Sequence, residues 1–464
     1  MKNYLVFTMA TLLLGTACSS KKEHAEGFTG APGEVKLITL DPGHFHAALV
    51  QKVSYPQVSK DVYVYAPTGF DVNEHLKRIE GFNTRAENPT LWNEIVYTGT
   101  DYLEKMLAEK KGNVMIQAGN NGKKTEYIKK TLEAGINVLS DKPMAINSQN
   151  FKLLEECFDI ARQKNVLLYD IMTERNEITT MLQRELSTIP AIYGEQLKGA
   201  PDEPAIVKES VHHLFKLVDN KPLTRPVWYF DVTQQGEGIV DVTTHLVDLV
   251  QWEAFPEQII DYKKDIELVD ANRWTTSISP EEFKQVTGTD AYPDFLKKDV
   301  ENDTLKVYCN GDIVYKIKGV TAKVSVIWNY TFPEGGGDTH FSVMKGSKAD
   351  LIIRQGQEQG YKPELYIEAL PDIDLAAYEK ELAAAMSTVA DKYPGVALDK
   401  VSDNVWQVQI PATYRVGHEA HFGQVMENYL QYLHDGKLPD WEVPNMIAKY
   451  YVTTHALEMA KAKK

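Results

Sequence analysis

The sequence is poor in cysteine, with three among its 464 residues. So few cysteines exclude a disulfide-stapled scaffold and any zinc or iron–sulfur module built on thiolate ligands. Positive charge is also scarce: 50 Lys and Arg stand against 65 Asp and Glu, giving a net charge of −15. An acidic surface repels phosphate backbones and disfavours general nucleic-acid binding. What remains is an ordinary globular composition, 43% hydrophobic, long enough for about two to four domains. A small neutral molecule is the expected partner.

Long hydrophobic runs are missing except at the N-terminus, where residues 4–17 (YLVFTMATLLLGTA) follow a short basic start. A membrane-spanning helix needs about 20 such residues, so residues 1–17 are predicted to be a signal peptide. The segment that ends at Cys18 resembles a bacterial lipobox. We therefore expect lipidation of Cys18, a flexible tether over residues 18–34, and attachment to the bacterial cell envelope, facing the periplasm or the cell surface, through the lipid alone. The alternative is an ordinary secretion signal with an incidental cysteine.

Two patterns divide the remaining chain. From 35 to 170, apolar runs alternate with helical periodicity, which predicts a Rossmann-type doubly wound parallel sheet whose ligand crevice lies at the carboxyl ends of the strands. From 171 to 464 the pattern predicts an α+β domain with a large, mostly antiparallel open sheet. Its expected strands are residues 228–232, 305–309, 313–317, 322–328 and 350–353.

The turn after the first expected strand is a degenerate dinucleotide-binding motif. The usual fingerprint is G-x-G-x-x-G, and residues 41–46 read DPGHFH, which keeps the middle glycine alone. Gly43 stands where the backbone must approach the phosphates, so Pro42, Gly43, His44, Phe45 and His46 are candidate cofactor contacts. No acidic residue ends the second strand, where a ribose ligand is customary.

Three later segments carry a family resemblance. Residues 132–145 (LEAGINVLSDKPMA) closely resemble the ALEAGKHVLCEKPLA segment of the Gfo/Idh/MocA oxidoreductases. Residues 116–123 resemble that family's IATPNxxH, with Asn120 at the Asn position. Residues 236–248 resemble GGGxxxDxGxHxxD, with Asp241 and His245 in place and Thr243 replacing a glycine. A fourth, less specific match covers residues 341–352. All stand in family order, so the chain is identified as a member from about residue 35 to 352.

The resemblance implies a catalytic site and a cofactor, NAD or NADP. Asn120, Asp141 and Lys142 would join the 42–46 turn in holding that cofactor. His245 would accept a proton from a sugar hydroxyl, Lys142 would bind the reacting oxygen, and Asp241 would orient His245 or bind a neighbouring hydroxyl. The residues themselves agree, because positions four apart on a helix share one face and a carboxylate-oriented histidine is a suitable general base. Arg175 falls where the family carries an arginine near the substrate, and a homo-oligomer through the open sheet is also implied.

The expected function is an oxidoreductase that acts on a hydroxyl or keto group of a sugar or glycoside, such as C3, with tightly held NAD(P). A first alternative is a glycosidase that uses transient oxidation and elimination. A second is a sugar-binding lipoprotein without redox activity. His212 and His213 with His245, or His418 with His421, could suggest a metal, but no cysteine or H-E-x-x-H pattern supports zinc, and no metal is expected.

Overall fold

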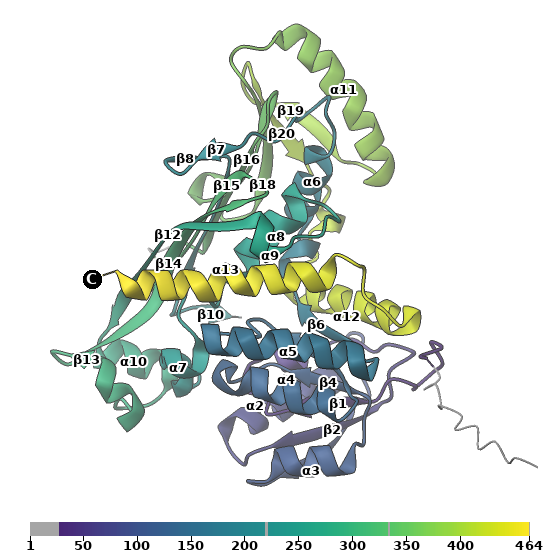
Figure 1. The fold of residues 1–464 in the computed structure, drawn as a ribbon, viewed down its shortest axis with the longest axis vertical. Helices are drawn as coiled ribbons and strands as arrows, with labels where there is room; N and C mark the ends of the chain where they lie inside the picture. The colour runs from purple at the N-terminus through teal and green to yellow at the C-terminus, as the bar shows by residue number, and fades with distance from the viewer. Residues whose placement is uncertain (1–26, 219–220, 333–334, 464) are drawn as a thin grey trace, which may run out of the picture.

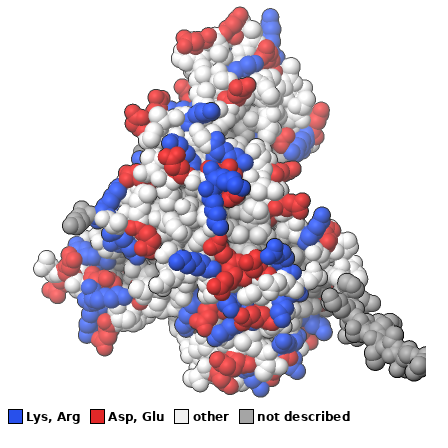
Figure 2. Space-filling view, in the orientation of Figure 1, with Lys and Arg blue, Asp and Glu red and all other residues white. Residues whose placement is uncertain are grey.

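The computed structural model describes residues 27–218, 221–332 and 335–463. The expected signal peptide, Cys18 and the start of the expected tether lie outside these ranges. Within them, no helix combines the length and hydropathy needed to cross a membrane. On the face shown in Figure 2, acidic and basic side chains are interspersed over most of the surface.

The first domain is the expected parallel sheet, with strand order β3-β2-β1-β4-β5-β6. Strands β1 and β4 are buried along their whole length, because helices cover both faces of the sheet and their sequences are accordingly almost wholly apolar. The strands are β1 Leu37–Leu40, β2 Asp61–Ala66, β3 Asn93–Thr98, β4 Val114–Gln117, β5 Asn137–Asp141 and β6 Leu168–Ile171. The helices are α1 His46–Leu49, α2 Phe70–Thr84, α3 Tyr102–Glu109, α4 Asn121–Glu133 and α5 Ser148–Lys164. The Rossmann prediction is confirmed.

The second domain is built on a ten-stranded sheet in the order β12-β14-β15-β9-β16-β17-β18-β20-β19, with β13 paired to β14. Strands β9 and β15 run parallel and the other described neighbours antiparallel, which confirms the mostly antiparallel open sheet. The strands are β9 Ile206–His213, β12 Ile266–Ile278, β13 Val300–Glu301, β14 Thr304–Ile317, β15 Val320–Asn329, β16 Thr339–Lys345, β17 Ala349–Gln355, β18 Glu364–Ala369, β19 Ala397–Lys400 and β20 Val405–Gln409. Two small hairpins pair β7 (Gly199–Ala200) with β8 (Glu203–Pro204) and β10 (Leu217–Val218) with β11 (Lys221–Pro222).

The strand expected at residues 228–232 is wrong. The segment forms a 3₁₀ turn, η2 (Val227–Phe230), followed by the short helix α7 (Val232–Gln235). Its aromatic and β-branched residues suit a strand, but the Asp231 carboxylate accepts a hydrogen bond from the Thr233 N–H and caps α7 instead. Local capping therefore overrides side-chain propensity here.

The remaining helices surround the sheet and join the two domains. They are η1 Thr173–Asn176, α6 Ile178–Ser187, α8 Thr243–Ala254, α9 Tyr262–Asp265, α10 Pro280–Thr287, η3 Asp294–Asp299, η4 Gln357–Gln359, α11 Leu375–Lys392, η5 Ala412–Tyr414, α12 His418–Asp435 and α13 Glu442–Ala462. Helix α13 runs between the two domains and contacts α5 on one side and β12 and α8 on the other (Figure 1).

Helix α12 adds Phe422, Met426 and Tyr429 to the core of the first domain. The end of the chain thus packs back onto the Rossmann sheet, and the division at residue 170 stays a prediction. One consequence concerns the cleft, because the contact of α12 with η1 holds the last helices against the carboxyl end of β6.

Candidate active site

Three adjoining cavities form one cleft along the carboxyl ends of the parallel strands. The first, of about 430 Å³, lies beyond β2, the second, of about 320 Å³, lies over the Gly43 turn, and the third, of about 920 Å³, reaches His245. Arg225 lines all three cavities, so they lie next to one another. The Arg225–Trp228 segment of the second domain forms the wall opposite the β1 turn.

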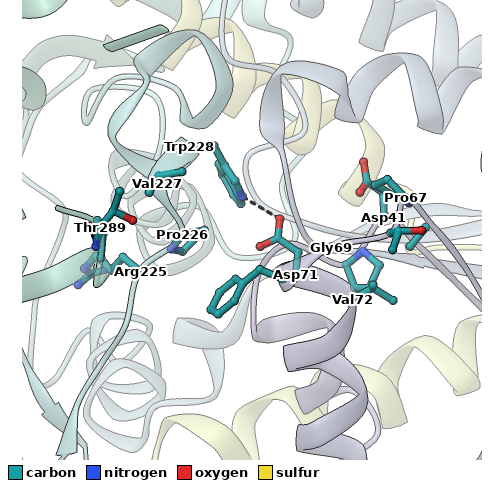
Figure 3. Close-up of a pocket in the computed structure, with 15 residues that line it drawn as sticks. Asp41, Pro67, Gly69, Asp71, Val72, Arg225, Pro226, Val227, Trp228 and Thr289 are labelled. Carbon is teal, nitrogen blue, oxygen red and sulfur yellow. Dashed lines mark hydrogen bonds between the residues drawn. The ribbon is translucent and has the colours of Figure 1, made fainter. Parts of the chain in front are cut away.

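Asp71 and Trp228 face each other across the first cavity. Asp71 lies in the first turn of α2, and its Oδ2 accepts a hydrogen bond of 2.9 Å from Trp228 Nε1 (Figure 3). A Cβ on Gly43 would lie 3.0 Å from the Trp228 ring and 3.2 Å from Asp71 Oδ2. A residue larger than glycine would therefore crowd the Asp71–Trp228 pair. Burial raises the pKa of Asp71. A carboxylate thus stands near the end of β2, where the sequence offered none.

The β1 turn differs from a standard phosphate-binding turn. The N–H groups of Gly43 and His44 both donate to the Ala118 carbonyl at 3.1 Å, and α1 has only four residues. A Cβ on Gly119 would lie 2.5 Å from the Asp41 carbonyl oxygen, so Gly119 permits this close contact between the β1 and β4 turns. The Asp41 carboxylate accepts hydrogen bonds from the hydroxyls of Tyr102 and Tyr127. These bonds stabilise its negative charge at this turn.

His46 contacts the end of β5 through Asp141. His46 Nδ1 lies 3.0 Å from Asp141 Oδ2, and His44 Nδ1 lies 3.7 Å from the same oxygen. Both His44 and His46 line the large cavity, whereas Asp141 is buried. Asn120, which was expected to contact the cofactor, caps α4 through Gly122 N–H and donates to Gln234 of α7. The structure therefore places Asn120 at the contact between the two domains.

Lys142 and Asp241 form a buried ion pair in the wall of the large cavity. Lys142 Nζ lies 2.7 Å from Asp241 Oδ1, and the side chains are 11% and 8% exposed. The second Asp241 oxygen accepts a hydrogen bond of 3.0 Å from Gln235 Nε2. Burial opposes the charge on Lys142, but Asp241 and Asp141 outweigh it and raise the Lys142 pKa. The ammonium is therefore charged at neutral pH and reaches the cavity from the end of β5.

His245 lines the same cavity from the first turn of α8. The expectation that Asp241 and His245 share a helix face is not met, since α8 begins at Thr243 and Asp241 lies in the turn before it. The buried His245 Nδ1 has no hydrogen-bond partner among the described residues. Burial, reinforced by the Lys142 charge, lowers the His245 pKa to about 4. The ring is therefore neutral at physiological pH and can accept a proton.

Arg175 does not line the cleft in the described structure. Its guanidinium binds Asp248 through two hydrogen bonds of 2.6 and 2.7 Å and Glu442 through one of 2.8 Å. Lys449, fully buried, joins Asp248 to Asp170. This network links η1, α8 and α13. Arg175 was expected to lie beside the cavity, but the neighbouring Glu174 lines it instead. Glu174 Oε1 lies 3.6 Å from His418 Nδ1.

Sequence reasoning missed several residues of the cleft. Asp71 and Trp228 carry no motif, and they meet only because the second domain folds over the first. Lys124 is fully buried and donates to the Asp141 carbonyl at 2.8 Å. Seven of the 12 histidines of the chain line the large cavity, namely His44, His46, His212, His245, His340, His418 and His421. Their positions in the sequence are too scattered to suggest one cluster.

The cleft fits a nicotinamide dinucleotide. It passes the Gly43 turn, and it carries the Asp71 carboxylate near the end of β2 and a charged Lys142 in the large cavity. Its midsection departs from the usual pattern, because the N–H groups of Gly43 and His44 are already bonded to the Ala118 carbonyl. Phosphate contacts at this turn therefore need other donors.

Comparison with known proteins agrees with the fold. Residues 72–170 match the family described as "Oxidoreductase family, NAD-binding Rossmann fold", and residues 182–461 match "Putative oxidoreductase C terminal domain". No curated protein matches the sequence.

Solved structures are similar over nearly the whole chain. A crystal structure of "a putative oxidoreductase" from Parabacteroides merdae is 88% identical, covers 95% of this chain and 100% of its own, and has a TM-score of 0.94. Levoglucosan dehydrogenase with NADH and levoglucosan is 12% identical over 93% of this chain and 98% of its own (TM-score 0.59). A 3-ketoreductase mutant from Actinomadura kijaniata, crystallised with NADP, is 13% identical over 92% of this chain and 97% of its own (TM-score 0.54). The last two show the fold alone.

Proposed function

This chain belongs to the Gfo/Idh/MocA family of NAD(P)-binding oxidoreductases, and on that premise we propose that it oxidises or reduces a hydroxyl or keto carbon of a sugar or glycoside. The observation that carries the proposal is the convergence of three side chains on one cavity: a charged Lys142, its partner Asp241 and a neutral His245. A volume of about 920 Å³ accommodates a sugar larger than a monosaccharide.

Each of the three side chains has a task in this proposal. The neutral His245 ring takes the hydroxyl proton as the carbon is oxidised, and its desolvated position keeps it unprotonated until then. Lys142 donates a hydrogen bond to the reacting oxygen, which stabilises the negative charge that grows there. Asp241 holds Lys142 at 2.7 Å and accepts a bond from an adjacent hydroxyl. When bound, the nicotinamide supplies the hydride acceptor or donor.

Asp71 favours NAD over NADP in this proposal. A carboxylate at the end of β2 accepts hydrogen bonds from ribose hydroxyls and repels a 2′-phosphate, and Asp71 projects into the corresponding cavity from α2. The adenosine end of the cofactor would lie there, between the Ala66–Gly69 loop and Trp228.

We further propose that the protein works as a lipid-anchored enzyme of the cell envelope, with the lipid on Cys18. Free NAD is scarce outside the cytoplasm, so the enzyme would retain its cofactor and recycle it within one site. Sugars and glycosides suit the acidic surface, because they are neutral and are not repelled by it.

The test is to purify the chain from residue 19 onward, release its ligands by denaturation, and identify them by mass spectrometry. We expect NAD, and a keto sugar after incubation with a panel of glycosides. His245→Asn should give no keto sugar, whereas the matched variant His434→Asn, on the exposed end of α12, should behave as wild type. Free aglycone without net redox change would indicate the glycosidase instead. A protein that neither contains nor binds a nicotinamide dinucleotide would refute both redox functions.

A further inference from the structure

His44, His46 and Asp141 bring three metal-ligating side chains together beside the large cavity. One ligand atom from each lies within 4.8 Å of the other two. The Nδ1 atoms of His46 and His44 lie 3.0 and 3.7 Å from Asp141 Oδ2. Ligand atoms about 2.1 Å from a tetrahedral ion are about 3.4 Å apart, a value between these two separations. The three side chains need only small shifts to share one ion.

The donor types suit a metal ion. Two imidazoles and one carboxylate are the donor set of open zinc sites.

The neighbouring groups compete weakly for these donors, since His44 Nδ1 accepts only a long hydrogen bond of 3.4 Å from the His46 backbone N–H, which an ion would displace. The ammonium of Lys142, next in sequence to Asp141, is directed to Asp241 at 2.7 Å and leaves the Asp141 Oδ2 atom to the histidines. His46 stands where the dinucleotide fingerprint has its third glycine, and it is buried against Phe422 with ring centroids 4.6 Å apart. Packing between α1 and the sheet favours glycine there, so a buried histidine serves another purpose.

We propose that His44, His46 and Asp141 bind one divalent ion of the zinc type, with at least one coordination position open to the large cavity. His44 and His46 line that cavity, so the open position faces the space assigned to substrate and cofactor, where an oxygen of either can complete the coordination. This site goes beyond the proposed oxidoreductase function and does not rest on it, because the three ligands are in place without a dinucleotide.

The test uses the chain from residue 19 onward, made without a polyhistidine tag and stripped with a chelator. Zn²⁺ is titrated by calorimetry with and without NAD⁺, and Co²⁺ is added separately to record its visible absorption. We expect one equivalent of Zn²⁺ and a Co²⁺ spectrum typical of four- or five-coordinate nitrogen and oxygen ligation. His44→Ala should weaken binding more than about 100-fold, because losing even an outer-shell partner costs about 10–100-fold.

Two further variants separate this site from other histidines. His46→Gly removes a ligand and should lose the ion. His434→Ala, whose side chain is 54% exposed, should bind Zn²⁺ as wild type does. The proposal is overturned if the wild type does not bind Zn²⁺, or if His44→Ala binds it as tightly as the wild type does. It is also overturned if His421→Ala loses the ion while His44→Ala and His46→Gly keep it. Zinc binding without any NAD⁺ binding would leave the metal site standing and refute the proposed function instead.

Discussion

Replacing Lys142 by Met should separate stability from catalysis at the candidate active site. The substitution leaves the Asp241 carboxylate, 8% exposed, with Gln235 as its remaining hydrogen-bond partner among the described residues. Removing one partner of a buried ion pair costs about 3–5 kcal/mol. Because 11% of the Lys142 side chain reaches the cavity, water can partly solvate the carboxylate, and we expect the lower end, about 3 kcal/mol of unfolding free energy.

The double variant Lys142→Met/Asp241→Asn supplies the check. It removes both charges, so most of the lost stability should return, leaving a deficit of about 1 kcal/mol. Activity should not return, since loss of the positioned donor is expected to lower kcat/KM by about 10²–10³-fold.

Urea unfolding followed by tryptophan fluorescence measures the unfolding free energy. Turnover of the glycoside found for the wild type measures kcat/KM. Lys316→Met is the control, because its pair with Glu267 is exposed and exposed pairs contribute about 0–1 kcal/mol. If the double variant were as unstable as Lys142→Met, or if it recovered wild-type activity, the assigned role of the pair would be wrong.

Three other outcomes follow from the same structure. Arg175→Met should lower the unfolding free energy by about 3–5 kcal/mol, because it removes the cation that pairs with the buried Glu442 carboxylate and leaves Asp248 with Lys449 alone. Urea unfolding measures this loss, and a value under 1 kcal/mol would contradict it. Asp71→Asn keeps the acceptor for Trp228 but loses the charge, so the ratio of NADP to NAD affinity should rise about 10-fold in calorimetric titrations, and an unchanged ratio would remove Asp71 from the ribose site. The lowered pKa of His245 keeps its neutral form as pH falls, so kcat/KM should decline only near pH 4; a decline centred near 6.5 would show an ordinary histidine.

Much of the fold could be predicted because it depends on local patterns. The apolar runs of β1, β4 and β5, with helical segments between them, indicate a parallel sheet. The carboxyl ends of these strands then place Gly43 and Lys142 in one crevice. The strand predicted at residues 228–232 was wrong because two local signals conflict there. Its aromatic residues favour a strand, whereas the Asp231 cap of α7 decides its conformation.

The site was predicted only where a motif keeps its residues close in sequence. Lys142 and His245 line the cavity as expected. Arg175 lies one position from Glu174, but the charges of Asp248 and Glu442 draw its guanidinium into the interior. Asp71 meets Trp228 across 157 positions of sequence, and no periodicity encodes such a contact. Long-range electrostatics and domain packing thus determine what local patterns leave open.

The central claim, hydride transfer between a sugar carbon and a nicotinamide in this cleft, has a direct test. The NAD-loaded protein is mixed with the glycoside found for the wild type, deuterated at the carbon that is oxidised, and the dinucleotide is analysed by mass spectrometry after one turnover. The account predicts one deuterium on the reduced nicotinamide with wild type and none with His245→Asn. Formation of the keto sugar with no deuterium on the dinucleotide would contradict it.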